Sequence, residues 1–321
     1  MTHSTYRPTH EFSALRVGDI SLDRVAIVGA NQMLFLYEGS NDHYRSYSKF
    51  RKSQLIETGR EWANLTAQRQ SKSSDSLQVL SLFVPNPASC MPDLYPLPLP
   101  VCPTAAWTEM RRLLADDSGV LFCDELFTAS LPENRSAANP WLRTDSHWSE
   151  FGSLIVVNAI LDRLGVSPIM AQSVSTEPFF LSGDLGYRFG DEVGVSVMGS
   201  LFVDLPTPSC VYDSGNGSMD GASMGRRVEW RCPDAPLPSS LVVVGNSFAG
   251  TGLSRNHLTY WLSRVFQRTV FLHGASVPTD VVETYQPDIL LFQGLERFFG
   301  IVPVDAYTTE ECERIYVPPT V

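Results

Sequence analysis

Short apolar runs that alternate with amphipathic segments constrain the fold of this 321-residue chain more than any other feature. The runs have the length of buried strands and lie at 77–87, 119–126, 241–245, 269–273 and 287–293. Apolar residues at helical spacing predict helices at 104–117, 149–165, about 255–267 and near 278–285. Strands that alternate with helices favour a mainly parallel sheet covered on both faces. The sequence therefore predicts an α/β fold.

Smaller elements accompany this pattern. Residues 24–39 alternate apolar runs with Gly and Asn, which predicts two strands joined by a tight turn near Ala30–Asn31. The spacing of apolar residues within 43–72 predicts a surface helix. Thr104 is a suitable N-cap for the helix that follows it, because its hydroxyl can accept a backbone N–H.

The segment 166–238 differs in character from the rest of the chain. It is rich in Gly, Pro and Ser with short β-like runs, which predicts an irregular, β-rich insertion with a loop at 214–225. We expect a single catalytic domain over residues 21–321 that contains this insertion. Residues 1–20 would form an N-terminal extension.

The composition excludes several classes of protein. A formal net charge of −11 without any basic run argues against nucleic acid or an anionic membrane surface as a partner. The apolar stretches are too short to span a bilayer, so no membrane insertion is expected. Residues 1–20 lack the apolar core of a secretory signal. This predicts a cytoplasmic protein, or a periplasmic one if an export signal has been removed from it.

The six cysteines are scattered along the chain. They are Cys90, Cys102, Cys123, Cys210, Cys232 and Cys312, and none forms a Cys-x-x-Cys pair. The usual zinc spacings are therefore missing, and buried free thiols are favoured over a disulfide framework. We expect neither a metal nor an organic cofactor.

Ser247 lies where a buried strand ends. The stretch "LVVVGNSFAGTGL" (241–253) places four apolar residues before Gly245-Asn246-Ser247, and small residues and a helix follow. Open α/β sheets bind ligands at the carboxyl ends of their strands, and backbone N–H groups at such a turn can stabilise an oxyanion. Ser247 is therefore either a nucleophile or an ordinary cap of a strand-to-helix turn.

Asp145 and His147 form a second candidate pair, within "LRTDSHWSEFG" (142–152). In an extended segment, residues i and i+2 point to the same side, so the carboxylate could orient the imidazole. A serine hydroxyl needs such an oriented base to act as a nucleophile at neutral pH. The alternative is an exposed loop in which His147 caps the following helix.

Together these motifs show a resemblance to a known family. "TDSHWSEFG" resembles the Asp-x-His-Trp signature of the alginate O-acetyltransferase family (the AlgX/AlgJ type), and "GNSF" occupies the place of its nucleophile motif. Further stretches match in the same order: "IVGANQMLFLYEGSND" (27–42), "LFVPNPASCMPD" (82–93), "SGDLG" (182–186) and "PDILLFQGLERFF" (287–299). The resemblance extends from about residue 20 to residue 300.

The resemblance implies a three-layer SGNH-hydrolase-like domain and a serine-dependent O-acetyltransferase. It assigns Ser247 as nucleophile, His147 as general base and then acid, and Asp145 as the residue that orients the imidazole. Its partners would be an acyl donor and a hydroxylated carbohydrate or small-molecule acceptor. If water is the acceptor, the same residues make an esterase or deacetylase. A non-catalytic carbohydrate-binding protein is a further alternative.

Four residues are candidates for the rim of this site. Arg297 either binds a hydroxylated or anionic substrate or forms a structural ion pair with Glu296 or another neighbour. Asn86 either donates its amide to the oxyanion or forms a turn beside Pro87. Trp148 either packs under the histidine or stacks on a sugar ring. Asn246 completes the set.

The sequence also departs from the family pattern. Pro87 stands where the family has a lysine, and Asn246 replaces the Asp or Thr before the nucleophile. The family acts in the periplasm on exported polysaccharide, whereas no export signal is evident in this sequence. The resemblance therefore does not identify the substrate.

Overall fold

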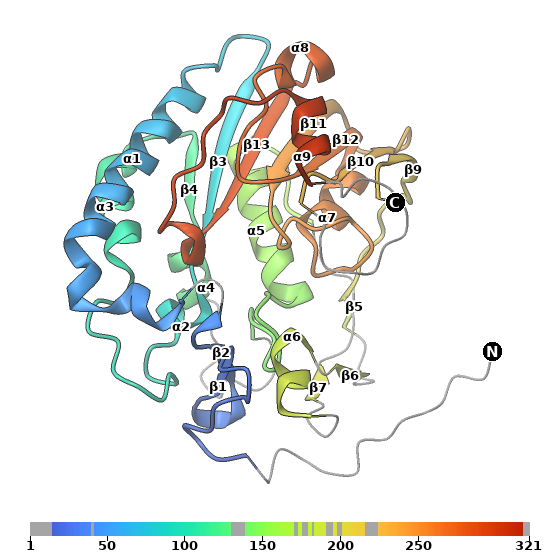
Figure 1. Cartoon of the computed structure of the whole chain (residues 1–321). Helices are drawn as coiled ribbons and strands as arrows, with labels where there is room; N and C mark the ends of the chain where they lie inside the picture. The colour runs from blue at the N-terminus through green and yellow to red at the C-terminus, as the bar shows by residue number, and fades with distance from the viewer. Residues whose placement is uncertain are drawn as a thin grey trace.

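A seven-stranded sheet forms the centre of the protein (Figure 1), with strand order β4-β3-β13-β11-β12-β10-β9. The computed structural model describes residues 15–39, 42–129, 139–169, 173–174, 179–181, 183–190, 195–197, 201–215 and 224–316. The strands of the sheet are β3 (Gln78–Val84), β4 (Val120–Phe122), β9 (Ser209–Asp213), β10 (Arg227–Arg231), β11 (Leu237–Gly245), β12 (Phe266–His273) and β13 (Ile289–Leu295). Strands β4, β3, β13, β11 and β12 are mutually parallel, whereas β10 and β9 extend the edge in antiparallel fashion. The prediction of a mainly parallel α/β sheet is confirmed.

Helices cover both faces of the sheet (Figure 1). On one face lie α1 (Lys52–Gln70), α3 (Ala105–Leu114) and α8 (Val281–Tyr285). On the other lie α5 (Glu150–Arg163) and α7 (Leu258–Val265). Helices were predicted at all five places. Thr104 caps α3 as expected, since its hydroxyl accepts the N–H of Trp107 at 3.4 Å.

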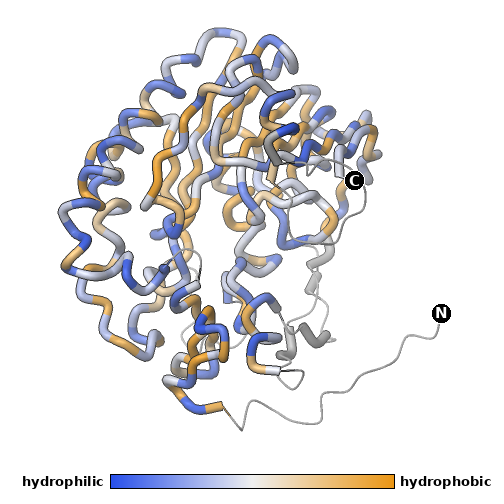
Figure 2. Tube along the Cα trace, in the orientation of Figure 1, coloured by the Kyte–Doolittle hydropathy of each residue, from blue (hydrophilic) through white to orange (hydrophobic). Residues whose placement is uncertain are grey.

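The apolar strands are buried on both faces because successive side chains alternate between two cores. In β11, Leu241 and Val243 pack toward α5 and α7, and Val242 and Val244 pack toward α1 and α3. The strands accordingly form a hydrophobic centre in Figure 2. This packing fixes the carboxyl ends of β3, β11, β12 and β13 along one edge of the sheet.

Short elements gather mainly at that edge and around it. The predicted N-terminal strands are β1 (Ala26–Val28) and β2 (Leu34–Leu36), which pair antiparallel around the turn η2 (Ala30–Gln32). The remaining elements are η4 (Tyr44–Tyr47), η5 (Lys49–Arg51), α2 (Pro87–Cys90), α4 (Asp124–Ala129), β5 (Ser173–Val174), β6 (Phe179–Leu181), α6 (Gly183–Gly186), η6 (Tyr187–Phe189), β7 (Val195–Val197), β8 (Leu201–Phe202), η7 (Glu296–Phe298) and α9 (Thr309–Tyr316).

The structure differs from the sequence prediction in two places. The strand expected at 119–126 ends at Phe122, because the acidic residues Asp124 and Glu125 begin α4 instead. Within the segment predicted as an irregular insertion, β9 and β10 are regular strands that extend the edge of the central sheet. The loop expected at 214–225 falls largely on residues 216–223, which lie outside the described residues.

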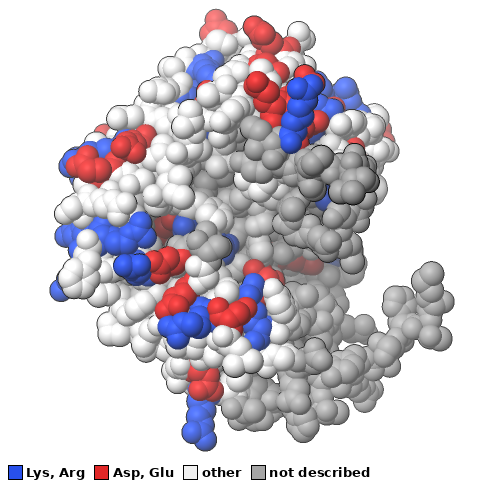
Figure 3. All heavy atoms as spheres, viewed as in Figure 1, with Lys and Arg blue, Asp and Glu red and all other residues white. Residues whose placement is uncertain are grey.

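The surface and the thiols agree with the composition. Figure 3 shows Lys, Arg, Asp and Glu side chains intermingled on one face of the molecule. All six cysteines are free thiols, and Cys90, Cys123 and Cys232 are buried. Within the described ranges, no helix is both long enough and apolar enough to cross a bilayer.

Candidate active site

Ser247 lies in the turn that follows β11. The side chain of Asn246 accepts the N–H of Phe248 at 3.0 Å, and its carbonyl accepts the N–H groups of Ala249 and Gly250. These bonds close the turn directly after the strand and leave Ser247 exposed while Phe248 is buried. The buried strand and the Asn246 side chain thus present the Ser247 hydroxyl at the carboxyl edge of the sheet.

Asp145 and His147 lie in a loop that is fixed at both ends. Trp141 and Trp148 form a β-bridge across it, and the N–H of Leu142 donates to the carbonyl of His147 at 3.2 Å. Ser149 then caps α5 by accepting the N–H of Gly152 at 3.1 Å. The cap is therefore Ser149 rather than His147, which leaves the His147 ring available to the site.

The two loops meet through the His147 ring. Its Nε2 lies 2.8 Å from Ser247 Oγ, and its Nδ1 lies 2.6 Å from Asp145 Oδ1. With a proton on Nδ1 donated to the carboxylate, Nε2 accepts from the serine hydroxyl. Asp145 Oδ1 also accepts the backbone N–H of His147 at 2.8 Å. The three residues singled out in the sequence are thus brought together in one hydrogen-bonded chain.

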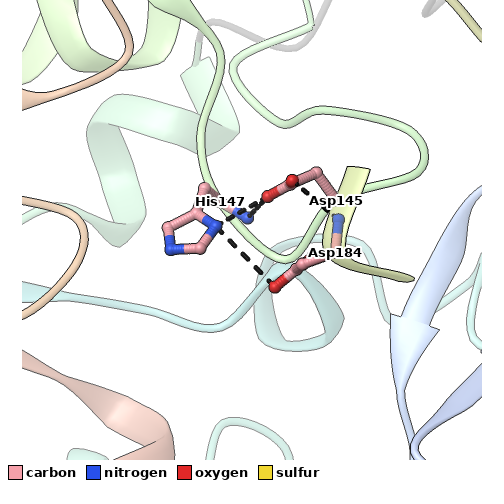
Figure 4. A group of neighbouring side chains, drawn as sticks. All are labelled: Asp145, His147 and Asp184. Carbon is pink, nitrogen blue, oxygen red and sulfur yellow. Dashed lines mark hydrogen bonds and ion pairs between the residues drawn. The ribbon is translucent and has the colours of Figure 1, made fainter. Parts of the chain in front are cut away.

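Asp184, from α6, lies beside Asp145 and His147 (Figure 4). Its Oδ1 and Oδ2 accept the N–H and hydroxyl of Ser146 at 2.5 and 2.6 Å. Its own N–H donates to Asp145 Oδ2 at 2.9 Å, and its carboxylate lies 3.8 Å from His147 Nδ1. Asp184 belongs to "SGDLG", a stretch used for the family resemblance, but the sequence analysis did not assign it to the site.

The same three side chains, Asp145, His147 and Asp184, place ligand atoms within 4.8 Å of one another, which is a spacing that a metal ion can use. Asp145 Oδ1 is already bonded to His147 Nδ1, and Asp145 Oδ2 accepts the N–H of Asp184 (Figure 4). Asp184 Oδ2 accepts the Ser146 hydroxyl. A metal would have to displace those bonds. The arrangement therefore favours a hydrogen-bonded carboxylate pair over a metal centre.

Burial and charge tune the groups around His147. Burial alone would raise the pKa of Asp145, but the hydrogen bond and charge of His147, with two backbone N–H groups, lower the pKa to about 2. Burial lowers the pKa of Arg297 to about 10, although Asp184 and Asp145 oppose the shift. The pKa of His257 is lowered to about 4 by burial and by the nearby His147. At neutral pH the site therefore holds ionised Asp145, charged Arg297 and neutral His257.

Phe248 connects the aromatic support of the site. Its ring lies 4.7 Å from the His147 ring and 5.0 Å from that of Trp148, and the Arg297 guanidinium lies 5.1 Å from its centroid. Trp148 is fully buried and donates its indole N–H to the carbonyl of Asn256. It therefore packs beneath the site, as one of the two alternatives predicted, and presents no face to a sugar.

The structure does not bring Asn86 to Ser247. Asn86 is fully buried, and its amide donates to the Tyr47 hydroxyl at 3.1 Å. Its backbone N–H donates to Glu296 at 2.8 Å, and that carboxylate also accepts the N–H of Thr104. Glu296 is thus held by backbone groups, and the Arg297 guanidinium donates to the carbonyl of Ser146 at 3.4 Å.

A cavity of about 610 Å³ opens beside Ser247. Asn246 and Arg297 also line it, as does Gln293, whose side chain accepts the N–H of Asn246 at 3.1 Å. Gln293 was not predicted as a site residue, although a lone amide in the buried run "ILLFQGL" is a signal for one. His273, the last residue of β12, lines the same cavity and was not predicted either.

Several solved protein structures superpose on this chain. The O-acetyltransferase domain of Pseudomonas putida AlgJ superposes with a TM-score of 0.51 at 14% identity, covering 91% of this chain and 98% of that chain. A DHHW family protein from Eubacterium siraeum gives 0.51 at 13% identity, covering 90% and 98%. Bacillus cereus PatB1 gives 0.51 at 13% identity, covering 84% and 95%.

The chain has the α/β fold of these proteins. The resemblance to the AlgX/AlgJ family is thereby confirmed at the level of the fold, over most of the chain. No protein-family model matches the sequence, and no curated protein sequence matches it. Because identity is 14% or less for all three structures, activity must be argued from the residues of this chain.

Proposed function

We propose that this protein is a serine-dependent O-acyltransferase that acts on a hydroxyl of a carbohydrate or small metabolite through a seryl ester. The observation that supports this most is the 2.8 Å separation of His147 Nε2 and Ser247 Oγ, with Asp145 at 2.6 Å from Nδ1. A base that is itself oriented by a carboxylate is what a serine hydroxyl needs to become nucleophilic. The O-acetyltransferase domain of AlgJ shares the fold, which is consistent with this class of reaction.

In the first half-reaction, His147 Nε2 takes the proton of Ser247 as Oγ attacks the carbonyl carbon of an acyl ester or thioester. The tetrahedral intermediate then collapses, the bond to the leaving group breaks, and His147 returns the proton to that group. Ser247 and Arg297 both line the cavity, so the backbone N–H of Ser247 and the charge of Arg297 would stabilise the oxyanion. Ser247 now carries the acyl group as an ester.

In the second half-reaction, an acceptor hydroxyl takes the place of the leaving group. His147 removes its proton, the acceptor oxygen attacks the ester carbonyl, and Ser247 leaves and regains a proton. Asp145 stays ionised throughout and stabilises the imidazolium that forms twice in the cycle. Water as acceptor would make the same residues an esterase, so the nature of the acceptor distinguishes the two activities.

Intact-protein mass spectrometry after brief exposure to p-nitrophenyl acetate tests the proposal. The wild type should gain about 42 Da, the mass of one acetyl ester, at a peptide containing Ser247. Ser247→Ala should gain nothing. Ser71→Ala alters a surface serine that is distant in sequence from Ser247, and it should behave as wild type. Addition of methyl glucoside should then yield the acetylated sugar if the enzyme is a transferase and acetate if it is an esterase. A wild type that neither acquires the adduct nor releases p-nitrophenol faster than Ser247→Ala would contradict the proposal and favour a non-catalytic binding protein.

A further inference from the structure

The cavity beside Ser247 is lined by both polar and apolar residues. Ser247, Asn246, Gln293 and Arg297 are among the polar ones. The rest of its wall is largely apolar or glycine, from Trp62, Met224, Gly274, Ala275, Phe292, Gly294, Leu295, Phe298, Gly300, Ile301 and Pro303, with Asp42, Arg51 and His273 as further polar members. Its walls run from Trp62 and Phe292, which are 2% and 1% exposed, to Ile301, which is 80% exposed.

The apolar wall is a fixed part of the fold. The Trp62 indole donates to the carbonyl of Ile301 at 3.2 Å, which ties the loop after β13 to α1. Phe299 packs against Trp62 and Phe83, with ring centroids 5.1 and 5.6 Å apart. Buried Glu296, at the start of the same loop, accepts two backbone N–H groups from other segments. The cavity is therefore held open by packing on both sides of the loop.

The size and lining of this cavity exceed what an acetyl group needs. Cavities of roughly 300–1,000 Å³ hold ligands of drug size, and apolar linings favour apolar ligands. A seryl acetate would contribute one methyl group to about 610 Å³ of space. A sugar in the same place would find no side-chain hydrogen-bond partner in Phe298, Leu295 or Ile301, whereas an aliphatic chain would cover their apolar surface.

We propose that this cavity binds an aliphatic acyl chain of about four to eight carbons, with its carbonyl at Ser247 and its tail along the Phe298–Ile301 wall. This inference rests on the proposed function and names its acyl group: the ester on Ser247 would be butanoyl to octanoyl rather than acetyl alone. The bonds made and broken are those of the two half-reactions above.

A series of p-nitrophenyl esters from acetate to octanoate tests the inference. Each methylene buried in the cavity should raise kcat/KM roughly fourfold, so hexanoate, with four more methylenes, should exceed acetate by roughly 250-fold. Intact mass should show the longer acyl group on Ser247. Values of kcat/KM that stay level or fall with chain length, while Ser247-dependent acetate turnover persists, would overturn the inference and leave the proposed function standing. Absence of Ser247-dependent turnover with every ester would overturn both.

Gly300→Phe provides the structural control. A Cβ at Gly300 would meet only the Arg51 side chain at 3.8 Å, and its φ is not left-handed, so a side chain can enter the cavity without backbone strain. The ratio of hexanoate to acetate kcat/KM should fall at least tenfold. Gly274→Leu, whose Cβ would meet only Ser276 at 3.9 Å, is the second variant should the first fail to fold. Leu22→Ala alters an aliphatic residue that is fully exposed and outside the cavity, and it should keep the wild-type ratio. A wild-type ratio in folded Gly300→Phe and Gly274→Leu would show that the chain does not occupy this cavity.

Discussion

Asp184 holds Ser146 with both carboxylate oxygens, which accept its backbone N–H at 2.5 Å and its hydroxyl at 2.6 Å. Ser146 lies between Asp145 and His147, so these two hydrogen bonds orient both neighbouring side chains. Asp184 also donates its N–H to Asp145. Its role in catalysis would therefore be to position the base rather than to touch the substrate.

Asp184→Asn should accordingly lower kcat by roughly 10- to 100-fold, with little change in KM. An amide has a single acceptor oxygen, so the Ser146 hydroxyl would have to change from donor to acceptor, and the negative charge 3.8 Å from His147 Nδ1 would be lost. A displacement of about 1 Å can cost on the order of 10²-fold in rate. Turnover of p-nitrophenyl esters measures the effect. Asp234→Asn, an exposed aspartate away from the site, should behave as wild type. Equal kcat for Asp184→Asn and Asp234→Asn would rule out a positioning role.

Asp145→Asn should have a larger effect than Asp184→Asn. The asparagine would fit the same space but would favour the wrong tautomer of His147 and could not stabilise the imidazolium. We expect kcat to fall by about 10³- to 10⁴-fold, while thermal unfolding confirms that the variant is folded. Because the pKa of Asp145 is lowered to about 2, its carboxylate stays ionised above roughly pH 3. Loss of activity between pH 5 and 7 in the wild type should therefore not come from Asp145.

Gly183 makes the contact between α6 and the Asp145 loop possible. It has φ +68°, and a Cβ there would lie 2.2 Å from the Thr144 carbonyl oxygen. That carbonyl accepts the N–H groups of Leu185 and Gly186, so the clash would push α6 away from Asp145. Gly183→Ala should therefore lower both the free energy of unfolding and kcat.

Gly165 offers a matched control for Gly183. It has the same φ of +68°, but a Cβ there would meet nothing within 4 Å. Gly165→Ala should lose only about 1–2 kcal/mol of stability from the left-handed backbone. Gly183→Ala should lose more than that in urea unfolding, and it alone should lower kcat. Similar losses in the two variants would mean that the Thr144 contact is unimportant.

Local signals predicted the secondary structure well, because apolar spacing and caps are properties of neighbouring residues. They did not predict that β10 would join β12, since the pairing of Arg227 with Leu272 is fixed by packing far along the chain. The strand at 119–126 was predicted too long, because a helix start signal in Asp124 and Glu125 was overlooked.

The candidate site was also predictable in part from local signals. The strand pattern implies that Ser247 lies at the carboxyl edge of the sheet, whereas His147 reaches that edge from the loop that precedes α5. The role of Asp184 depends on a left-handed glycine that turns α6 onto Thr144, and no periodicity reports such a contact. Asn86 has the residue type of an oxyanion donor, but its amide is already used by Tyr47 inside the core.

His43 should make the fold sensitive to mild acid. It is buried, and its Nδ1 has no hydrogen-bond partner within the described residues. Burial, with the charge of Arg297, lowers its pKa to about 3 from the ordinary 6.5. Between pH 6.5 and pH 3, His43 is therefore protonated in the unfolded chain and neutral in the folded chain. Its contribution to stability is complete above pH 6.5 and declines as the pH falls. At pH 5 this amounts to about 2 kcal/mol of lost stability.

His43→Gln removes this proton and tests its contribution. Urea unfolding of the wild type at pH 7 and pH 5 should show a larger loss of stability than the variant shows over the same interval, by about 2 kcal/mol. His257, whose pKa is lowered to about 4, remains in the variant and should keep part of the acid sensitivity. His257→Gln is the parallel measurement. In the double variant, neither histidine should contribute to the loss of stability between pH 7 and pH 5. If the stability of His43→Gln depends on pH as the wild type does, the prediction is wrong. Such a result would mean that the folded and unfolded chains bind protons at His43 alike.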